Sequence, residues 1–432
     1  MDTLPFPPRP NLEQYRKRAK DLVKASKSHD LAAVHAWATT WIESLARALE
    51  VPECPPLQAM MDRAVELLER HIREEFASKN RDVTLADAQR LIARAHSFDS
   101  WSDFATHADP ANYPQDSVFE NAVNAVITGD LATLDALLRA NPELIHTRSA
   151  RVHRVTLLHY VAANGVEDWR QKTPPNAVAI ATRLLDAGAE VDALAETYGG
   201  GNAQTTMNLL VSSVHPHEAG LQSALVDVLL DYGAAVDGLD HDGSPLMTSL
   251  AFGYIEPAET LARRGARIDN VVAAASLGDA ELVERFVNDG VGIAPSLENL
   301  YWIHIPKDTK SRAEFALAWA CAYGRTEAAT LLLEHGVSPA SADNSAMTAL
   351  HWAAGHGYME LVDLLLKCAA PLEARNAWGG TVLSSTIWFA RQSPMKGADY
   401  PAVVQRLVAA GADVSHVHHP TGDARIDKAL RG

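Results

Sequence analysis

Residues 348–366 have the sequence TALHWAAGHGYMELVDLLL, and this stretch decides the fold. Its Thr-x-Leu-His start, paired alanines and glycines predict one short helix, and the leucines after Glu360 predict a second. Residues 156–165, TLLHYVAANG, repeat the first half of this pattern. Weaker copies begin at Thr205, Ser244, Phe315 and Thr381. Such self-similarity is typical of stacked helical units, each of which is too small to bury a core alone.

The end of the second helix is repeated as well. A short apolar ending followed by glycine or a similar residue occurs eight times, with markers at positions 141, 188, 233, 265, 290, 336, 369 and 411. Glycine after a helix adopts a positive φ without a Cβ clash, so each marker predicts a helix C-terminus. The intervals are 47, 45, 32, 25, 46, 33 and 42 residues, and two of them lie near 33.

In these two motifs the chain resembles ankyrin repeats over residues 117–419. The resemblance implies an all-α fold, an ankyrin-repeat solenoid of about eight helix-pair units. Intervals above 33 predict enlarged loops, and the interval of 25 predicts a repeat without a full finger. The loops are expected at residues 166–176, 198–203, 214–220, 292–310 and 391–400. Residues 420–432 are expected to form a polar C-terminal cap.

Residues 1–110 have balanced charges and are expected to form an amino-terminal helical bundle. Asn11 and Asp30 are candidate N-caps for the first two helices. Three more helices are predicted, from Leu57, from Thr84 and from Ser100. Residues 85–104 resemble the helical module that often precedes bacterial repeat domains, a resemblance that carries no function.

Charge and composition disfavour several classes of function. The chain has 38 Lys+Arg against 54 Asp+Glu, and its net charge of -16 repels nucleic-acid phosphates and anionic membranes. Three cysteines without a C-x-x-C motif predict neither a disulfide framework nor a cysteine zinc site. The sequence has no signal-peptide pattern and no apolar run of membrane-spanning length, so we expect a cytoplasmic protein.

The histidines have ordinary structural interpretations. His159 and His351 follow Thr156 and Thr348 by three residues, where an ankyrin core is expected to hydrogen-bond the two side chains. The insert with His215 and His217 is expected to be a polar loop, because it lacks further zinc ligands. The histidines at positions 416, 418 and 419 are expected to lie at the surface. No nucleophile elbow or phosphate loop is present, so no catalytic residue, metal or cofactor is predicted.

By resemblance, the chain is expected to be a non-enzymatic scaffold that binds a partner protein through its finger tips and concave groove. The candidate finger-tip residues are His153, Tyr198, His241, Ser345 and Trp378. The candidate inner-helix residues are Asn164, Ser213, Phe252, Tyr323, His356 and Trp388. Aromatic side chains with a polar edge are typical of interface hot spots. The alternative for Trp378 and Trp388 is packing against a neighbouring finger.

Two other functions remain open at this point. The enlarged loops could form a small-molecule or catalytic site, with contributions from Tyr198, His215, Tyr301, Trp302 and His304, because loops of that size call for a reason. Alternatively, the amino-terminal bundle could carry the activity, and the repeats would only direct that activity to its target. Its balanced charge and lack of clustered His, Asp or Cys residues disfavour that hypothesis.

Overall fold

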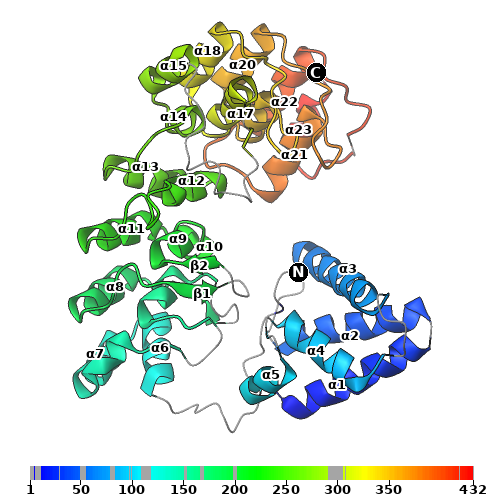
Figure 1. Cartoon of the computed structure of the whole chain (residues 1–432). Helices are drawn as coiled ribbons and strands as arrows, with labels where there is room; N and C mark the ends of the chain where they lie inside the picture. Colours follow the sequence, from blue (N-terminus) through cyan, green and yellow to red (C-terminus); the bar gives the residue numbers. More distant parts are fainter. Residues whose placement is uncertain are drawn as a thin grey trace. The chain divides into compact units, whose positions relative to one another are not determined.

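The computed structural model describes residues 4, 11–28, 30–48, 55–77, 83–96, 98, 100–108, 118–149, 153–165, 170–197, 202–289, 305–306, 308–417 and 419–431. The chain divides into two compact units, Met1–Ala234 and Ala235–Gly432, called here the first and the second unit (Figure 1). Within the described ranges, no helix has both the length and the apolar character needed to cross a membrane.

The first unit begins with five helices, α1 (Leu12–Lys27), α2 (Leu31–Ala48), α3 (Pro55–Ala77), α4 (Leu85–Ala95) and α5 (Trp101–Ala108). The side chains of Asn11 and Asp30 accept hydrogen bonds from backbone N–H groups in the first turns of α1 and α2. Both predicted N-caps are therefore confirmed. Helix α3 begins earlier than the expected Leu57, because proline is tolerated in a first turn, where its missing N–H is not needed.

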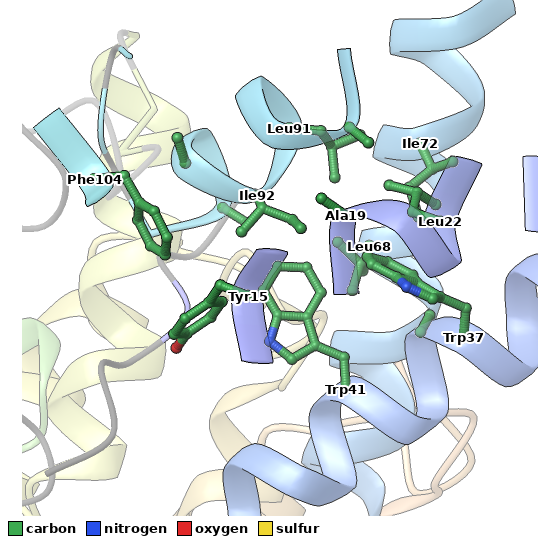
Figure 2. Close-up of a cluster of buried hydrophobic side chains, with 14 of the residues drawn as sticks. Tyr15, Ala19, Leu22, Trp37, Trp41, Leu68, Ile72, Leu91, Ile92 and Phe104 are labelled. Carbon is green, nitrogen blue, oxygen red and sulfur yellow. The ribbon is translucent and has the colours of Figure 1, made fainter. Parts of the chain in front are cut away.

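Aromatic side chains fill the centre of this bundle (Figure 2). Tyr15, Trp41 and Phe104 are at most 2% exposed, and the rings of Tyr15 and Phe104 meet edge to face with centroids 4.9 Å apart. His96 stacks on Phe104 at 5.5 Å, and its Nδ1 lies 2.9 Å from the carbonyl oxygen of Leu4. Burial lowers the pKa of His96 to about 4, so the imidazole is a neutral core group at neutral pH.

In the described part of the chain after this bundle, eight pairs of helices follow, and in each pair an inner helix precedes and packs against an outer one. In the first unit the pairs are α6 (Val118–Thr128) with α7 (Leu131–Ala140), the 3₁₀ helix η3 (Leu157–Ala162) with α8 (Ala177–Asp186), and α9 (Thr206–Leu210) with α11 (Gln222–Asp231). In the second unit they are α12 (Ser244–Ala251) with α13 (Ile255–Arg263), α14 (Val271–Leu277) with α15 (Ala280–Asp289), α17 (Thr309–Ala322) with α18 (Thr326–Glu334), α19 (Ala349–Gly355) with α20 (Met359–Lys367), and α21 (Val382–Gln392) with α22 (Tyr400–Ala409). Successive inner helices α14, α17, α19 and α21 stack on one another. This is the predicted all-α solenoid of helix pairs.

Several connections between the helices have their own secondary structure. A 3₁₀ helix, η2 (Pro142–His146), follows α7, and strands β1 (Ala195–Thr197) and β2 (Asn202–Gln204) form an antiparallel hairpin. The predicted loop at residues 214–220 contains a short helix, α10 (Val214–Glu218). Asn270 caps α14 only five residues after Gly265, whereas Thr348 caps α19 twelve residues after Gly336. The predicted repeat without a full finger is therefore confirmed.

Six outer helices end in the same hydrogen-bond pattern. The marker residue donates to the carbonyl three residues back, and the next residue donates to the carbonyl five residues back, at Gly188, Gly233, Gly265, Gly336, Ala369 and Gly411. All six have a positive φ, which confirms these predicted C-termini. Helix α7 also ends as predicted, but Asn141 has a φ of -138° because Pro142 follows it and disfavours helical conformations there. Position 290 lies outside the described residues.

The Thr-x-x-His motif forms a reciprocal cap at the start of two inner helices. The backbone N–H of Thr348 donates to Nδ1 of His351 at 3.2 Å, and the Thr348 hydroxyl lies 2.7 Å from the same nitrogen. The Nε2 atom of His351 donates to the carbonyl of Gly380 at 3.2 Å, which joins the cap to the next finger. Thr156 and His159 repeat this arrangement, so the predicted structural role of both histidines is confirmed.

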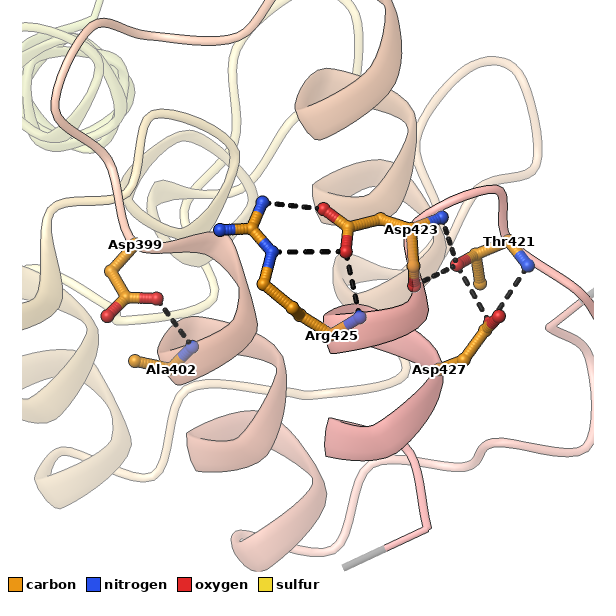
Figure 3. Close-up of polar contacts among 6 residues, drawn as sticks. All are labelled: Asp399, Ala402, Thr421, Asp423, Arg425 and Asp427. Atoms are coloured by element: carbon orange, nitrogen blue, oxygen red, sulfur yellow. Dashed lines mark hydrogen bonds and ion pairs between the residues drawn. The ribbon is translucent and has the colours of Figure 1, made fainter.

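The described chain ends with a short helix, α23 (Ala424–Ala429), which packs against α22. Ile426 in this helix and Leu430 at its C-cap are 1% and 6% exposed. Asp423 caps this helix by accepting the backbone N–H of Arg425 at 2.8 Å, and it also pairs with the Arg425 guanidinium (Figure 3). The side-chain hydrogen bonds from Arg425 lower the pKa of Asp423 to about 2.

Candidate functional site

The predicted partner surface consists of finger tips and inner helices, and hydrogen bonds fix the fingers. In the first unit the backbone N–H of Glu196 donates to the carbonyl of His153 at 2.9 Å. In the second unit the backbone N–H of Ala377 donates to the carbonyl of Ser345 at 2.8 Å. Because each of these fingers holds its neighbour, the tip side chains are presented on a preorganised backbone.

The finger-tip side chains differ in exposure. Trp378 is 74% exposed, the largest value among the exposed large apolar residues of the described chain. His241 is also exposed and has a φ of 52°. His153 and Ser345 are half-buried. Tyr198, the remaining predicted finger-tip residue, lies outside the described residues.

Two predicted inner-helix residues of the first unit connect neighbouring repeats. The Nδ2 atom of Asn164 donates to the carbonyl of Leu209 at 3.0 Å and to the Ser212 hydroxyl at 2.8 Å. Ser213 is 2% exposed, and its hydroxyl donates to the carbonyl of Ala163 at 3.1 Å. These polar groups join the repeat of η3 to the repeat of α9, so a partner would compete with the stack for them.

Tyr323 and His356 have the same connecting role in the second unit. The Tyr323 hydroxyl donates to the carbonyl of Leu250 on α12. The Nδ1 atom of His356 lies 2.7 Å from the carbonyl oxygen of Ala322, at the end of the preceding inner helix. Burial raises the pKa of Tyr323, and desolvation lowers the pKa of His356 despite its hydrogen bond. Both side chains are therefore held uncharged between repeats at neutral pH.

The other two inner-helix candidates are exposed apolar side chains. Phe252, at the end of α12, is 47% exposed, and Trp388, on α21, is 56% exposed. The ring of Trp388 meets Phe389 edge to face at 5.3 Å, which leaves more than half of the residue accessible. Together with Trp378 and His241, these residues form the exposed part of the predicted surface.

The described residues show no group of three or more His, Cys, Asp and Glu side chains placed to hold a metal ion. His215 and His217 lie on α10. His416 and His419 each lie near a single carboxylate, that of Asp413 at 3.6 Å and that of Asp427 at 3.5 Å, whereas position 418 lies outside the described residues. Burial raises the pKa of the Cys321 thiol, so this cysteine stays protonated and unreactive.

A cavity of about 420 Å³ lies among α14, α15, α17 and the end of α18 in the second unit. Its walls include apolar Phe286 and Val337, and Lys310, Glu314 and His335 contribute polar groups. The Nζ atom of Lys310 is 3.9 Å from Oε1 of Glu314, so these two lining residues form an ion pair. Tyr301, Trp302 and His304, predicted for a ligand site, lie outside the described residues.

Three exposed residues that follow Trp388 in the sequence are not among the predicted site residues. Arg391 lies in the last turn of α21, and Met395 and Lys396 follow the helix in the predicted 391–400 loop. The sequence does mark this region by its charge. Residues 374–398 contain Arg375, Arg391 and Lys396 but no Asp or Glu, in a chain whose net charge is -16.

Comparison with known proteins identifies ankyrin repeats in part of the chain. Residues 271–376 match the family model for ankyrin repeats, in three copies. No match was found among curated proteins. Among solved structures, the chain is similar to the human ASB11 ankyrin repeat domain, with 23% identity and a TM-score of 0.33, over 68% of this chain and 98% of that one. The family match covers α14 to α20, where the stacked helix pairs and the Thr348–His351 cap lie. The chain therefore contains ankyrin repeats, and its fold is an all-α ankyrin-repeat solenoid.

Proposed function

We propose that the chain is a non-enzymatic scaffold of the cytoplasm that binds a partner protein through its finger tips and concave groove. Ankyrin repeats are generally protein-interaction scaffolds, which supports this function. Since one fold can host many functions, the proposal also needs a site with the properties of an interface.

The exposure of Trp378 is the observation that supports the proposal most directly. This residue is 74% exposed. Tryptophan is among the residues that contribute most to the binding energy of protein interfaces. Its position is fixed, because Oδ1 of Asn376 accepts the N–H groups of Trp378 at 3.1 Å and of Gly380 at 2.9 Å. A large apolar side chain on a rigid finger loses little conformational entropy when a partner covers it.

The test is affinity capture with the full chain and with variants of the exposed surface. Trp378→Ala combined with Phe252→Ala removes two exposed aromatic side chains of the second unit. Leu85→Ala is the matched control, because Leu85 is 41% exposed but lies in the amino-terminal bundle. Circular dichroism melting curves establish that each variant is folded. We expect a protein that the wild type and the control capture and that the double variant loses.

Capture that is equal in all three proteins would contradict binding through this surface. Cross-linking mass spectrometry on the captured complex adds a direct readout of the contact. Cross-links from the partner to the fingers at residues 343–346 and 375–380 are expected. Cross-links confined to the amino-terminal bundle would instead support the hypothesis that the bundle carries the activity.

The cavity of about 420 Å³ favours a second candidate function, the binding of a small molecule. Its volume lies in the range of ligand pockets, and its apolar walls with a few charged groups at the rim fit such a site. Ligand-observed NMR with metabolite mixtures tests this candidate. A ligand that binds the wild type but not a Val337→Trp variant, which fills the cavity from its rim, would support it.

A further inference from the structure

Helix α21 and the loop after it carry two exposed apolar and two exposed basic residues within nine positions of the sequence. Trp388 and Met395 are 56% and 41% exposed, and Arg391 and Lys396 are exposed beside them in sequence. Trp388 and Arg391 are three residues apart on α21 and so lie on one face of the helix. We call Trp388, Arg391, Met395 and Lys396 the end-repeat patch.

Trp388 occupies a position that is small in the two preceding repeats. Ala322, Gly355 and Trp388 follow one another at intervals of 33 residues, the length of one unit. A Cβ atom on Gly355 would lie 2.6 Å from the ring of Phe389 on α21, so this position faces the next inner helix. By the same register, Trp388 faces the place where a further inner helix would stack.

The final helix leaves Trp388 largely uncovered. Helix α23 packs against the outer helix α22, and Trp388 stays 56% exposed. A tryptophan that is 56% exposed on an inner helix presents a large apolar side chain that the described residues leave uncovered, and we read it as part of a docking surface.

The loop that carries Met395 and Lys396 is held in place. The Tyr400 hydroxyl accepts the backbone N–H of Met395 and donates to the carbonyl of Gly355, both at 3.0 Å. Ala398 packs against Gly357, where a Cβ atom would lie only 2.5 Å from the Ala398 side chain. The patch is thus preorganised by α19 and α22, which lowers the entropic cost of binding.

The charge of the patch indicates the chemistry of its partner. Among the described residues, neither Arg391 nor Lys396 has an ion-pair or hydrogen-bond partner. Residues 374–398 contain no Asp or Glu, although the whole chain has 54. Unpaired cations beside exposed apolar side chains are complementary to a segment that carries both carboxylates and a large apolar residue.

We propose that the end-repeat patch binds an acidic α-helical segment of a partner protein, which lies along α21 as a further inner helix would. A large apolar residue of that segment covers Trp388, and its carboxylates pair with Arg391 and Lys396. This inference rests on the proposed scaffold function and names the chemistry of the partner segment and the place where it docks.

The test uses a displayed library of random peptides, selected on the immobilised full chain. Enriched peptides are synthesised with a fluorescent label, and their affinity is measured by anisotropy at physiological salt. We expect peptides rich in Asp and Glu with at least one Trp, Phe or Leu. Trp388→Ala and the double substitution Arg391→Glu with Lys396→Glu should each weaken binding by about tenfold or more. Leu85→Ala, an exposed apolar residue of the amino-terminal bundle, should leave the affinity unchanged.

Several results would overturn the inference. Enrichment of neutral or basic peptides, or equal affinity for wild type and Trp388→Ala, would exclude this docking mode. Tighter binding of a labelled oligodeoxythymidine than of any peptide would assign the basic residues to nucleic acid. A concentration-dependent dimer that Trp388→Ala abolishes, seen by light scattering, would assign the patch to a second copy of the chain. If lysate capture succeeds through Trp378 while these peptide results fail, the scaffold function stands and only this inference falls.

Discussion

Acidification should destabilise the first unit through one buried histidine, His159. Its Nδ1 accepts the backbone N–H of Thr156 at 3.1 Å, and its Nε2 lies 3.0 Å from the carbonyl oxygen of Ala193, which can only accept. The neutral ring with its proton on Nε2 satisfies both contacts. A second proton, on Nδ1, would point at the Thr156 N–H, so the charged ring breaks the cap of η3. Burial is the main reason that the pKa of His159 falls to about 4.

The size of the effect follows from this pKa. A histidine in the unfolded chain has a pKa of about 6.5, so on acidification the unfolded state takes up its proton first. The contribution of His159 is therefore complete above about pH 6.5 and is lost as the pH falls toward about 4. At about pH 5 the unfolding free energy of this region should be lower than at about pH 7 by about 2 kcal/mol from His159 alone.

Native-state hydrogen exchange of residues 157–162, read by mass spectrometry and corrected for intrinsic rates, measures the opening free energy at both pH values. A His159→Gln variant should be less stable at neutral pH but should lose about 2 kcal/mol less than the wild type on acidification. If His159→Gln shows the full wild-type loss, the reasoning from the buried imidazole is refuted.

Three substitutions test the packing of the repeats by urea unfolding followed by circular dichroism. Ala369→Gly should raise the unfolding free energy by about 1 kcal/mol, since Ala369 has a φ of 58° that glycine adopts without strain; an unchanged midpoint would show that the strain is absent. Gly357→Ala should lower it by about 2 kcal/mol, because its φ is 76° and the new Cβ would lie 2.5 Å from Ala398; wild-type stability would mean that the 393–399 loop moves freely. Ser213→Ala should cost about 1 kcal/mol, because the carbonyl of Ala163 then loses a buried donor, and no loss would mean that this bond contributes nothing to the stack.

Local chemistry explains which parts of the fold were predictable. The Thr348–His351 cap and the glycine turns at positions 188, 233, 265, 336 and 411 follow from residue type alone, since few other residues satisfy those geometries. Asn141 ends α7 as the helix-ending pattern predicts, but it does not have the positive φ of the other markers. Pro142, the residue after it, disfavours helical conformations at Asn141. The hairpin of β1 and β2 and the helix α10 lie in inserts, where the repeat pattern gives no register.

The candidate site was predictable in position but not in role. In the structure, Tyr323 and His356 are the C-cap residues of α17 and α19, and Asn164 lies two residues after η3. The sequence could not show that their polar atoms bond to neighbouring repeats, because such contacts depend on the rotation of one helix against the next. The inferred orientation of Trp388 depends on the contact of Gly355 with Phe389 on α21, which no sequence pattern predicts.

The charge of the whole chain should shape how an acidic segment approaches the end-repeat patch. A net charge of -16 repels such a segment at long range, whereas Arg391 and Lys396 attract it only at short range. At physiological ionic strength the Debye length is about 8 Å, so the long-range repulsion is screened while the contact attraction persists. The affinity of a selected acidic peptide should therefore rise from low to physiological salt and fall again at high salt. Anisotropy over a salt series measures this, and a steady fall from the lowest salt upward would mean that only the local charges of the patch govern binding.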